Sequence, residues 1–346
     1  MKLYKLLSLS LLTLIFVSCG GKNNHIAPFT LKLSGVKNGV KNGTPIAYVL
    51  QNKTQQPISK AVFSVDGKIL KSSNDSLYLD LHSLGNKTLE VAITYGENSY
   101  KISEKIRVFA KEAPSLYTYK IINTFPHDEK AYTQGLEFYR DTLYESTGLR
   151  GYSSLRKVNY KTGEVLKKID LPAAVFGEGI SILNNQIYLL SWQSGKGYIY
   201  DLESFEEKGQ FSYGQSKEGW GLCNDGLSLF KSDGSQKIWR LDPENLKEID
   251  HIELATHKGF FKNTNELEYV NGKIYANVYL KESVMIVNAT SGAIEGVVNF
   301  SGLKELVNPH PELDVLNGIA YHPGRKTFFV TGKKWNKMFE VQLEKK

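Results

Sequence analysis

Thr133-Gln134-Gly135-Leu136-Glu137-Phe138 is the stretch that decides the fold, because similar stretches recur four times further along the chain. The other copies are Gly177-Glu178-Gly179-Ile180-Ser181-Ile182, Gly219-Trp220-Gly221-Leu222-Cys223-Asn224, Thr264-Asn265-Glu266-Leu267-Glu268-Tyr269 and Leu316-Asn317-Gly318-Ile319-Ala320-Tyr321. Their aligned Leu or Ile residues are spaced by about 44, 42, 45 and 52 residues, close to the length of one four-stranded propeller blade. Because each copy precedes a turn and a second β-type run, the sequence predicts a five-bladed β-propeller over residues 114–346.

Residues 27–113 show a different pattern of short runs in which apolar and polar residues alternate. The runs are Phe29–Leu33, Ile46–Leu50, Ala61–Val65, Leu77–Leu81, Leu89–Ile93 and Lys105–Phe109. Turn formers such as Asn42-Gly43 and Asp66-Gly67 separate them, and this period of two predicts antiparallel strands. We expect an all-β chain in which a small immunoglobulin-like β-sandwich precedes the propeller, with the boundary near Pro114.

The composition excludes several classes of protein. The 346 residues are 41% hydrophobic and 23% charged, which is ordinary for a folded protein of two domains. The net charge is +7, but the basic residues are scattered and form no stripe, so we expect no nucleic-acid partner. Two cysteines, Cys19 and Cys223, are too few for a disulfide scaffold or a cysteine-based zinc site, and we expect Cys223 to be buried.

The first residues have the pattern of an export signal. Lys2 and Lys5 precede a mostly apolar run of about a dozen residues, which is too short to span a bilayer. The run ends in Phe16-Val17-Ser18-Cys19, which resembles a bacterial lipoprotein signal. This resemblance implies removal of residues 1–18, acylation of Cys19, a tether over 19–26 and an exported protein anchored to a membrane and facing the periplasm. The alternative is an ordinary secretory signal cleaved nearby.

The repeat also predicts a site, because equivalent positions of propeller blades converge on the central axis. The residues before the recurring Gly-Leu or its counterpart are Gln134, Glu178, Trp220, Asn265 and Asn317, and candidates at the ends of the second strands are Thr147, Trp192, Lys231 or Asp233, Tyr279 and Lys333. These side chains predict a pocket with one carboxylate, one ammonium group, three amides and several aromatic rings. Glu178 is the sharpest candidate, because a carboxylate between two glycines is costly to bury without partners.

At these positions the sequence resembles the propeller-type glutaminyl-peptide cyclotransferase family of plants and bacteria, over residues 117–343. The motifs that carry the resemblance are Tyr132-Thr133-Gln134-Gly135-Leu136, Phe176-Gly177-Glu178-Gly179, Glu218-Gly219-Trp220-Gly221-Leu222, Asn265-Glu266-Leu267-Glu268-Tyr269, Leu316-Asn317-Gly318-Ile319-Ala320 and Val330-Thr331-Gly332-Lys333-Lys334-Trp335. The resemblance implies that Glu178 is the catalytic acid and base. It further implies substrate-binding roles for Gln134, Asn265, Lys333, Trp192 and Trp220, and we expect Phe176, Tyr279 and Asn317 to complete the pocket. Tyr279 departs from the family, which usually has tryptophan after the Asn-Val pair.

The reaction implied by the resemblance converts an N-terminal glutamine of a peptide or protein to pyroglutamate and releases ammonia. It requires no cofactor or catalytic metal, although a structural calcium ion is allowed, and we expect a monomer. A non-catalytic propeller that binds peptides or sugars in its funnel remains an alternative. A calcium-dependent hydrolase is disfavoured, because calcium takes six to eight oxygen ligands and Glu178 is expected to be the single carboxylate on the axis.

Overall fold

The structure is a computed structural model and describes residues 27–346. The predicted signal peptide, Cys19 and the tether lie outside the described residues. In the described part every regular element is a β-strand apart from one short 3-10 helix, η1 (Lys304–Leu306), so the all-β prediction is confirmed. This helix lies between the fourth and fifth copies of the repeat, where the spacing is longest. None of the helices in residues 27–346 has the length and apolar character needed to cross a membrane.

The first nine strands form two sheets that enclose their own core. One sheet has the order β1 (Phe29–Leu33), β3 (Pro45–Asn52), β7 (Ser76–Tyr78), β6 (Lys71–Ser73), and the other has the order β2 (Val40–Lys41), β9 (Asn98–Phe109), β8 (Gly85–Tyr95), β4 (Ile58–Val65), β5 (Lys68–Ile69). Alternate residues of β8 are buried, as the period of two predicts. Phe29, Leu77, Val91 and Val108 meet in a common core between the sheets.

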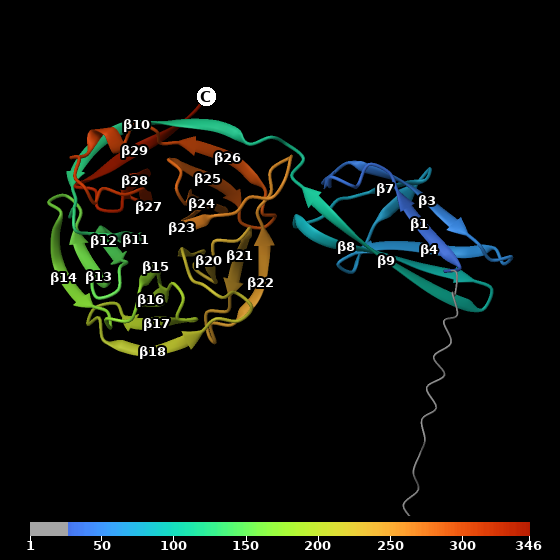
Figure 1. Cartoon of the computed structure of the whole chain (residues 1–346), viewed down its shortest axis with the longest axis horizontal. Helices are drawn as coiled ribbons and strands as arrows, with labels where there is room; N and C mark the ends of the chain where they lie inside the picture. Colours follow the sequence, from blue (N-terminus) through green and yellow to red (C-terminus); the bar gives the residue numbers. More distant parts are fainter. Residues whose placement is uncertain (1–26) are drawn as a thin grey trace, which may run out of the picture.

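Three further sheets each contain four consecutive antiparallel strands. They are β11 (Thr133–Tyr139), β12 (Thr142–Thr147), β13 (Ser154–Asn159) and β14 (Glu164–Asp170); β15 (Gly177–Leu183), β16 (Gln186–Ser191), β17 (Lys196–Asp201) and β18 (Glu207–Ser212); and β19 (Leu222–Asn224), β20 (Leu229–Ser232), β21 (Lys237–Leu241) and β22 (Glu248–Glu253). Figure 1 shows them arranged around a common centre, with the first strand of each sheet innermost.

An eight-stranded sheet completes the ring. Its order is β23 (Thr264–Val270), β24 (Lys273–Val278), β25 (Ser283–Asn288), β26 (Ile294–Asn299), β10 (Ser115–Pro126), β29 (Lys337–Lys345), β28 (Thr327–Gly332), β27 (Leu316–His322). Strand β10 comes before the other ring strands in the chain, yet it lies parallel to β26 and antiparallel to β29. It therefore ties the last two four-stranded units together along the rim (Figure 1).

The innermost strands explain the glycines of the repeat. Strands β11, β15, β19, β23 and β27 contact one another in a closed circle. A Cβ atom on Gly135 would lie 2.5 Å from the backbone nitrogen of Ile180, and one on Gly221 would lie 2.1 Å from the carbonyl oxygen of Asn265. Both distances are shorter than real Cβ contacts, so glycine is required there for close packing of the backbones.

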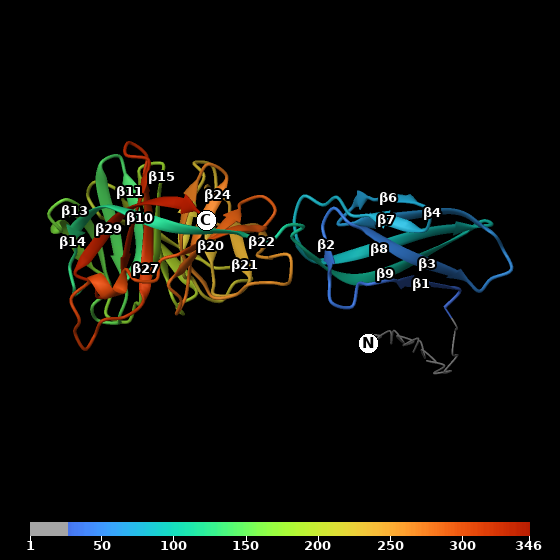
Figure 2. The ribbon, with the colours of Figure 1, turned by 90° about the horizontal axis from the view of Figure 1, so that it is seen from above.

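The two sets of strands meet along one edge of the ring (Figures 1 and 2). Buried Glu253 of β22 accepts hydrogen bonds from the backbone and side-chain nitrogens of Asn86, at 2.9 and 2.6 Å. Phe109 at the end of β9 lies edge-on to Phe260, with ring centroids 5.1 Å apart. This junction fixes the segment that leads from β22 to β23, where part of the candidate site begins.

Candidate functional site

The predicted site residues converge on a cavity of about 190 Å³ at one end of the ring centre. Its lining consists of Tyr132, Gln134, Phe176, Glu178, Trp192, Trp220, Asn265, Tyr279 and Lys333. Gln134, Glu178 and Asn265 each occupy the second position of an inner strand, whereas Trp192, Tyr279 and Lys333 directly follow the second strands β16, β24 and β28. Because these first strands begin where the second strands end, residues from all parts of the ring lie at the same opening.

Glu178 is a buried carboxyl group with one oxygen left free. Its Oε1 accepts a hydrogen bond of 3.1 Å from the amide nitrogen of Gln134, while Oε2 is buried and has no partner. Burial raises the pKa of Glu178 well above its usual value; the positive charge of Lys333 opposes this shift and the charge of Glu218 adds to it. A carboxyl group with a raised pKa holds its proton more readily than an ordinary one, and its free oxygen can accept a proton from a bound group or donate one to it.

Lys333 is the cationic group of the pocket. It is only 3% exposed, and burial lowers its pKa, although Glu178 and Asp314 act in the opposite direction. Its Nζ lies 4.7 Å from the ring centroid of Tyr132 and 5.5 Å from that of Tyr279. Within the described chain no ion pair of 4.0 Å or less joins Lys333 to Glu178. Glu178 and Lys333 thus line the same cavity without forming a direct ion pair.

Gln134 is held in one orientation by Asn317. The side-chain nitrogen of Asn317 donates to the carbonyl oxygen of Thr133 at 2.9 Å and to Oε1 of Gln134 at 3.2 Å. This arrangement leaves the Gln134 amide nitrogen to face Glu178. Asn317 itself does not line the cavity, so its predicted place among the lining residues is corrected to one behind Gln134, and the pocket has two amide side chains instead of three.

Aromatic rings form the wall of the cavity, and Glu218 anchors two of them. The indole nitrogens of Trp192 and Trp220 donate to the same oxygen of Glu218, at 2.9 and 2.8 Å. Phe176 lies edge-on to Trp192, and Tyr279 lies edge-on to Trp220. Glu218 was not predicted as a site residue, although it directly precedes the Gly-Trp-Gly of the third repeat; a carboxylate there fixes the shape of the wall.

Tyr132 is a second residue that sequence reasoning missed. Its ring lines the cavity beneath Lys333, and its hydroxyl donates a hydrogen bond of 2.8 Å to Asp314. Burial, together with that hydrogen bond, raises the pKa of Tyr132, so the hydroxyl stays protonated and acts as a donor. Its position could have identified it from the sequence, because Tyr132 lies one residue before the first copy of the repeat, where the chain enters the ring opening.

Three second-strand candidates lie outside the cavity. The hydroxyl of Thr147 bonds to Ser154, and the carboxylate of Asp233 accepts the indole N–H of Trp239 at 2.7 Å. The amino group of Lys231 donates to Ser216 and lies 4.4 Å from the ring centroid of Tyr213. Thr147 thus makes its contact within the first four-stranded unit, and Lys231 and Asp233 make theirs at the second and third; none of the three lines the pocket.

The ring centre contains more carboxyl groups than the sequence predicts. Glu137, Glu266 and Glu268 are largely buried, and burial raises the pKa of each, that of Glu137 to about 8. Glu266 replaces the glycine of the fourth repeat and accepts the backbone N–H of Ile319 at 2.9 Å. The expectation that Glu178 is the single axial carboxylate is therefore wrong. Even so, no cluster of three or more His, Cys, Asp or Glu side chains in residues 27–346 is arranged to hold a metal ion.

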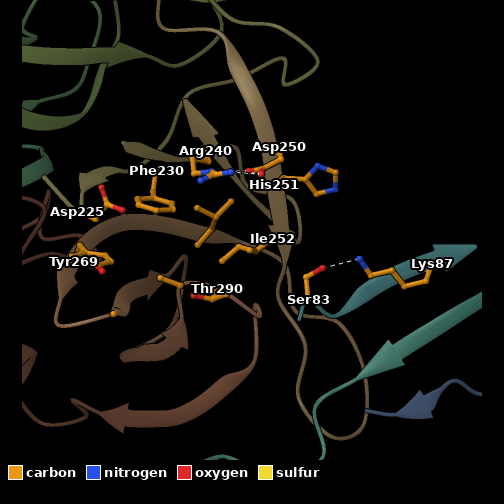
Figure 3. Close-up of a pocket in the computed structure, with 13 residues that line it drawn as sticks. Ser83, Lys87, Asp225, Phe230, Arg240, Asp250, His251, Ile252, Tyr269 and Thr290 are labelled. Carbon is orange, nitrogen blue, oxygen red and sulfur yellow. Dashed lines mark hydrogen bonds and ion pairs between the residues drawn. The ribbon is translucent and has the colours of Figure 1, made fainter. Parts of the chain in front are cut away.

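A separate cavity of about 490 Å³ lies at the junction between the two sets of strands (Figure 3). Arg240 and Asp250 form a two-point ion pair there, and Lys87 bonds to Ser83 and Asp66. None of the predicted site residues lines it. Because its charged groups already have partners, we place the candidate active site at the ring opening.

Cys223 is buried and free in the described chain, as expected.

Comparisons with known proteins show the family to which the chain belongs. The glutamine cyclotransferase family model matches residues 91–343. A glutaminyl-peptide cyclotransferase from Arabidopsis thaliana is 38% identical over 230 residues, which are 65% of this chain and 71% of that protein. The crystal structure of Myxococcus xanthus glutaminyl cyclase superposes with a TM-score of 0.63 at 30% identity, covering 67% of this chain and 99% of that one. The resemblance seen in the motifs is thus confirmed, and the chain belongs to the glutamine cyclotransferase family.

Proposed function

We propose that the chain is a glutaminyl-peptide cyclotransferase, an acyltransferase that cyclises the N-terminal glutamine of peptides and proteins. Family membership and the similarity to two glutaminyl cyclases support this activity. The observation that carries the mechanism is the free, buried Oε2 of Glu178 in a cavity that also contains Lys333. An unpaired buried oxygen is costly unless a ligand satisfies it, and the α-amino group of glutamine is a suitable donor.

The reaction is an internal acyl transfer. The α-nitrogen of the substrate attacks the carbon of its own side-chain carboxamide, a nitrogen–carbon bond forms, and the bond to the departing nitrogen breaks. Glu178 accepts the proton lost by the α-amine and delivers a proton to the leaving group, which departs as ammonia. Lys333 and the side-chain amide of Asn265 stabilise the negative oxygen of the tetrahedral intermediate. Since a free α-amine has a pKa of about 7.7–8.0, only a small shift is needed to obtain the neutral nucleophile.

The cavity contributes by restricting the substrate. Its volume of about 190 Å³ and its aromatic wall suit one folded glutamine side chain. Holding the amine against the carboxamide in that conformation supplies most of what an intramolecular reaction requires. The Gln134 nitrogen, oriented by Asn317, keeps the Glu178 carboxyl group pointed at the same place.

We also propose a finer description of the fold. The closed circle of five inner strands supports a five-bladed β-propeller over residues 114–346 whose last two blades are joined through β10. The separate core of β1 to β9 supports an immunoglobulin-like β-sandwich domain over residues 27–113. In this description the propeller is the catalytic domain, and the sandwich is attached at its third and fourth blades.

The direct experiment is ammonia release from a short glutamine-initiated peptide in buffer that contains a chelator. We expect release by the wild-type protein and a reduction of about 10²-fold or more in Glu178→Gln. The matched control, Glu244→Gln, changes an exposed carboxylate and should retain activity. If the folded wild-type protein releases no ammonia, the proposal is wrong and the propeller binds a ligand without converting it. Activity that requires added calcium would contradict the metal-free mechanism.

We further propose that the protein is exported, acylated at Cys19 and held at a membrane as a monomer facing the periplasm. The support is the signal-like sequence that ends at Cys19. Labelling with a radioactive fatty acid in a bacterial host should tag the wild-type protein and leave Cys19→Ala unlabelled. Equal labelling of both proteins would exclude this site of attachment.

A further inference from the structure

The catalytic cavity leaves most of a peptide substrate without a binding place. It holds about one residue, so the chain that follows the glutamine must leave through the ring opening. A larger groove of about 610 Å³ adjoins it and shares Tyr279 as a wall. We call this the side groove, lined mainly by Phe260, Phe261, Val278, Tyr279, Met285 and Val297.

The side groove has the character of a binding surface. Phe261 is 43% exposed, and Leu280, which follows Tyr279 in the chain, is 61% exposed. Leu280 also has a φ angle of 63°, a left-handed conformation that is unfavourable for a residue with a branched side chain. Exposed apolar side chains beside an apolar groove favour contact with a ligand over contact with water.

The groove is held in shape by the domain junction. Its Phe260 packs edge-on against Phe109 of the sandwich, and the carbonyl oxygen of Thr256 accepts the backbone N–H of Ala110 at 3.1 Å. On the side of the cavity, the backbone N–H of Tyr279 donates to the carbonyl oxygen of Asn263 at 2.9 Å. A groove that is formed in advance loses little entropy when a peptide binds.

The charges at the groove have one sign. Among the described lining residues only Lys262 and Lys281 are charged, and both side chains are exposed. The groove therefore attracts acidic groups and repels basic ones at its rim, while its floor accepts apolar side chains.

We propose that the side groove binds the residues that follow the N-terminal glutamine and selects peptides with apolar side chains there, followed by an acidic group. The inference rests on the proposed cyclotransferase activity and specifies its substrate class. Contacts made away from the reacting atoms discriminate between substrates through kcat/KM.

The first test compares kcat/KM for Gln-Leu-Phe-amide and Gln-Ser-Ser-amide. We expect the wild-type protein to favour the apolar peptide by about 10-fold in kcat/KM, because burying two apolar side chains contributes more free energy than a 10-fold ratio requires. Phe261→Ser should reduce the preference to about threefold or less. The control Leu227→Ser changes a more exposed apolar residue outside both cavities and should keep the full preference.

The second test reverses one charge. Wild-type protein should favour Gln-Leu-Glu-amide over Gln-Leu-Lys-amide, and Lys281→Glu should invert that order, with both effects weakened by salt. Equal rates for all these peptides, or a preference that survives Phe261→Ser and Lys281→Glu, would overturn the groove assignment. If none of the peptides releases ammonia, the proposed activity itself has failed, so the two failures are distinguishable.

Discussion

Glu178 is a side chain whose proposed catalytic role conflicts with stability. Its pKa is raised in the folded protein, so the protonated form is stabilising below the pKa of the unfolded chain, and that stability is lost as the pH rises through the folded pKa. Glu178→Gln, which should reduce turnover about 10²-fold or more, should therefore increase the free energy of unfolding at pH 8 by about 1 kcal/mol or more, or roughly 2–4 °C in Tm. Thermal unfolding at pH 4 and pH 8 checks this, since the gain should appear only at the higher pH.

We expect Glu218 to affect the proposed reaction through its neighbours. Its charge raises the pKa of Glu178, and its carboxylate holds the indoles of Trp192 and Trp220. Glu218→Gln retains an oxygen that can accept the indole N–H groups but removes the charge. The acid limb of the pH profile of kcat/KM should then move to lower pH, because Glu178 ionises more readily.

The comparison variant is Glu218→Leu, which removes the anchor of both rings. We expect kcat/KM to fall about 10- to 100-fold, because the wall no longer holds the substrate in the reactive conformation. A purely structural role for Glu218 would lower activity in both variants and leave the pH profile in place. The exposed control Glu244→Gln should change neither quantity.

Among the strands, β10 and β26 make the contact that joins the last two units of the ring into one sheet. A Cβ atom added to Gly296 of β26 would lie 2.8 Å from the ring of Tyr117 in β10, whereas one added to Gly209 of β18 meets nothing nearer than 3.8 Å. Gly296→Ala should lower the free energy of unfolding by about 1–3 kcal/mol, and Gly209→Ala should be neutral or slightly stabilising. Denaturant titration of both variants tests this; equal stabilities would contradict the close packing.

The strands also show which features of the fold and the site can be predicted from the sequence. The repeat predicts the strands and brings Gln134, Glu178 and Asn265 to one opening, because a fixed frame places equivalent residues together. It does not predict the direction of single side chains at the strand ends. Asn317 therefore lies behind the cavity, and Lys231 makes its contacts elsewhere. Such details depend on contacts between units that are distant in sequence, which no local pattern records.

For the whole molecule, the junction between the two sets of strands contains one buried carboxylate with several partners. Glu253 accepts hydrogen bonds from both nitrogens of Asn86 and from the side chain of Gln236. Glu253→Ala removes all three, and we expect the connecting segment that contains the exposed Lys111 to be cleaved several-fold faster by trypsin. The control Glu244→Ala should be cleaved at the wild-type rate. Cleavage of Glu253→Ala at the wild-type rate would show that Glu253 does not stabilise the junction.

The position of β10 has a consequence for the order in which the molecule is built. Tyr117 of β10 pairs with Lys345 of β29, so β10 cannot form this pairing until almost the whole chain has been synthesised. Pairings between such distant segments form slowly, while β1 to β9 can assemble from residues that are already present. Until residues 337–345 have been made, the last unit lacks β29, the strand that joins β28 to β10. The ring is therefore completed only when the last strand has been made, whereas the sheets of β1 to β9 can fold well before that point.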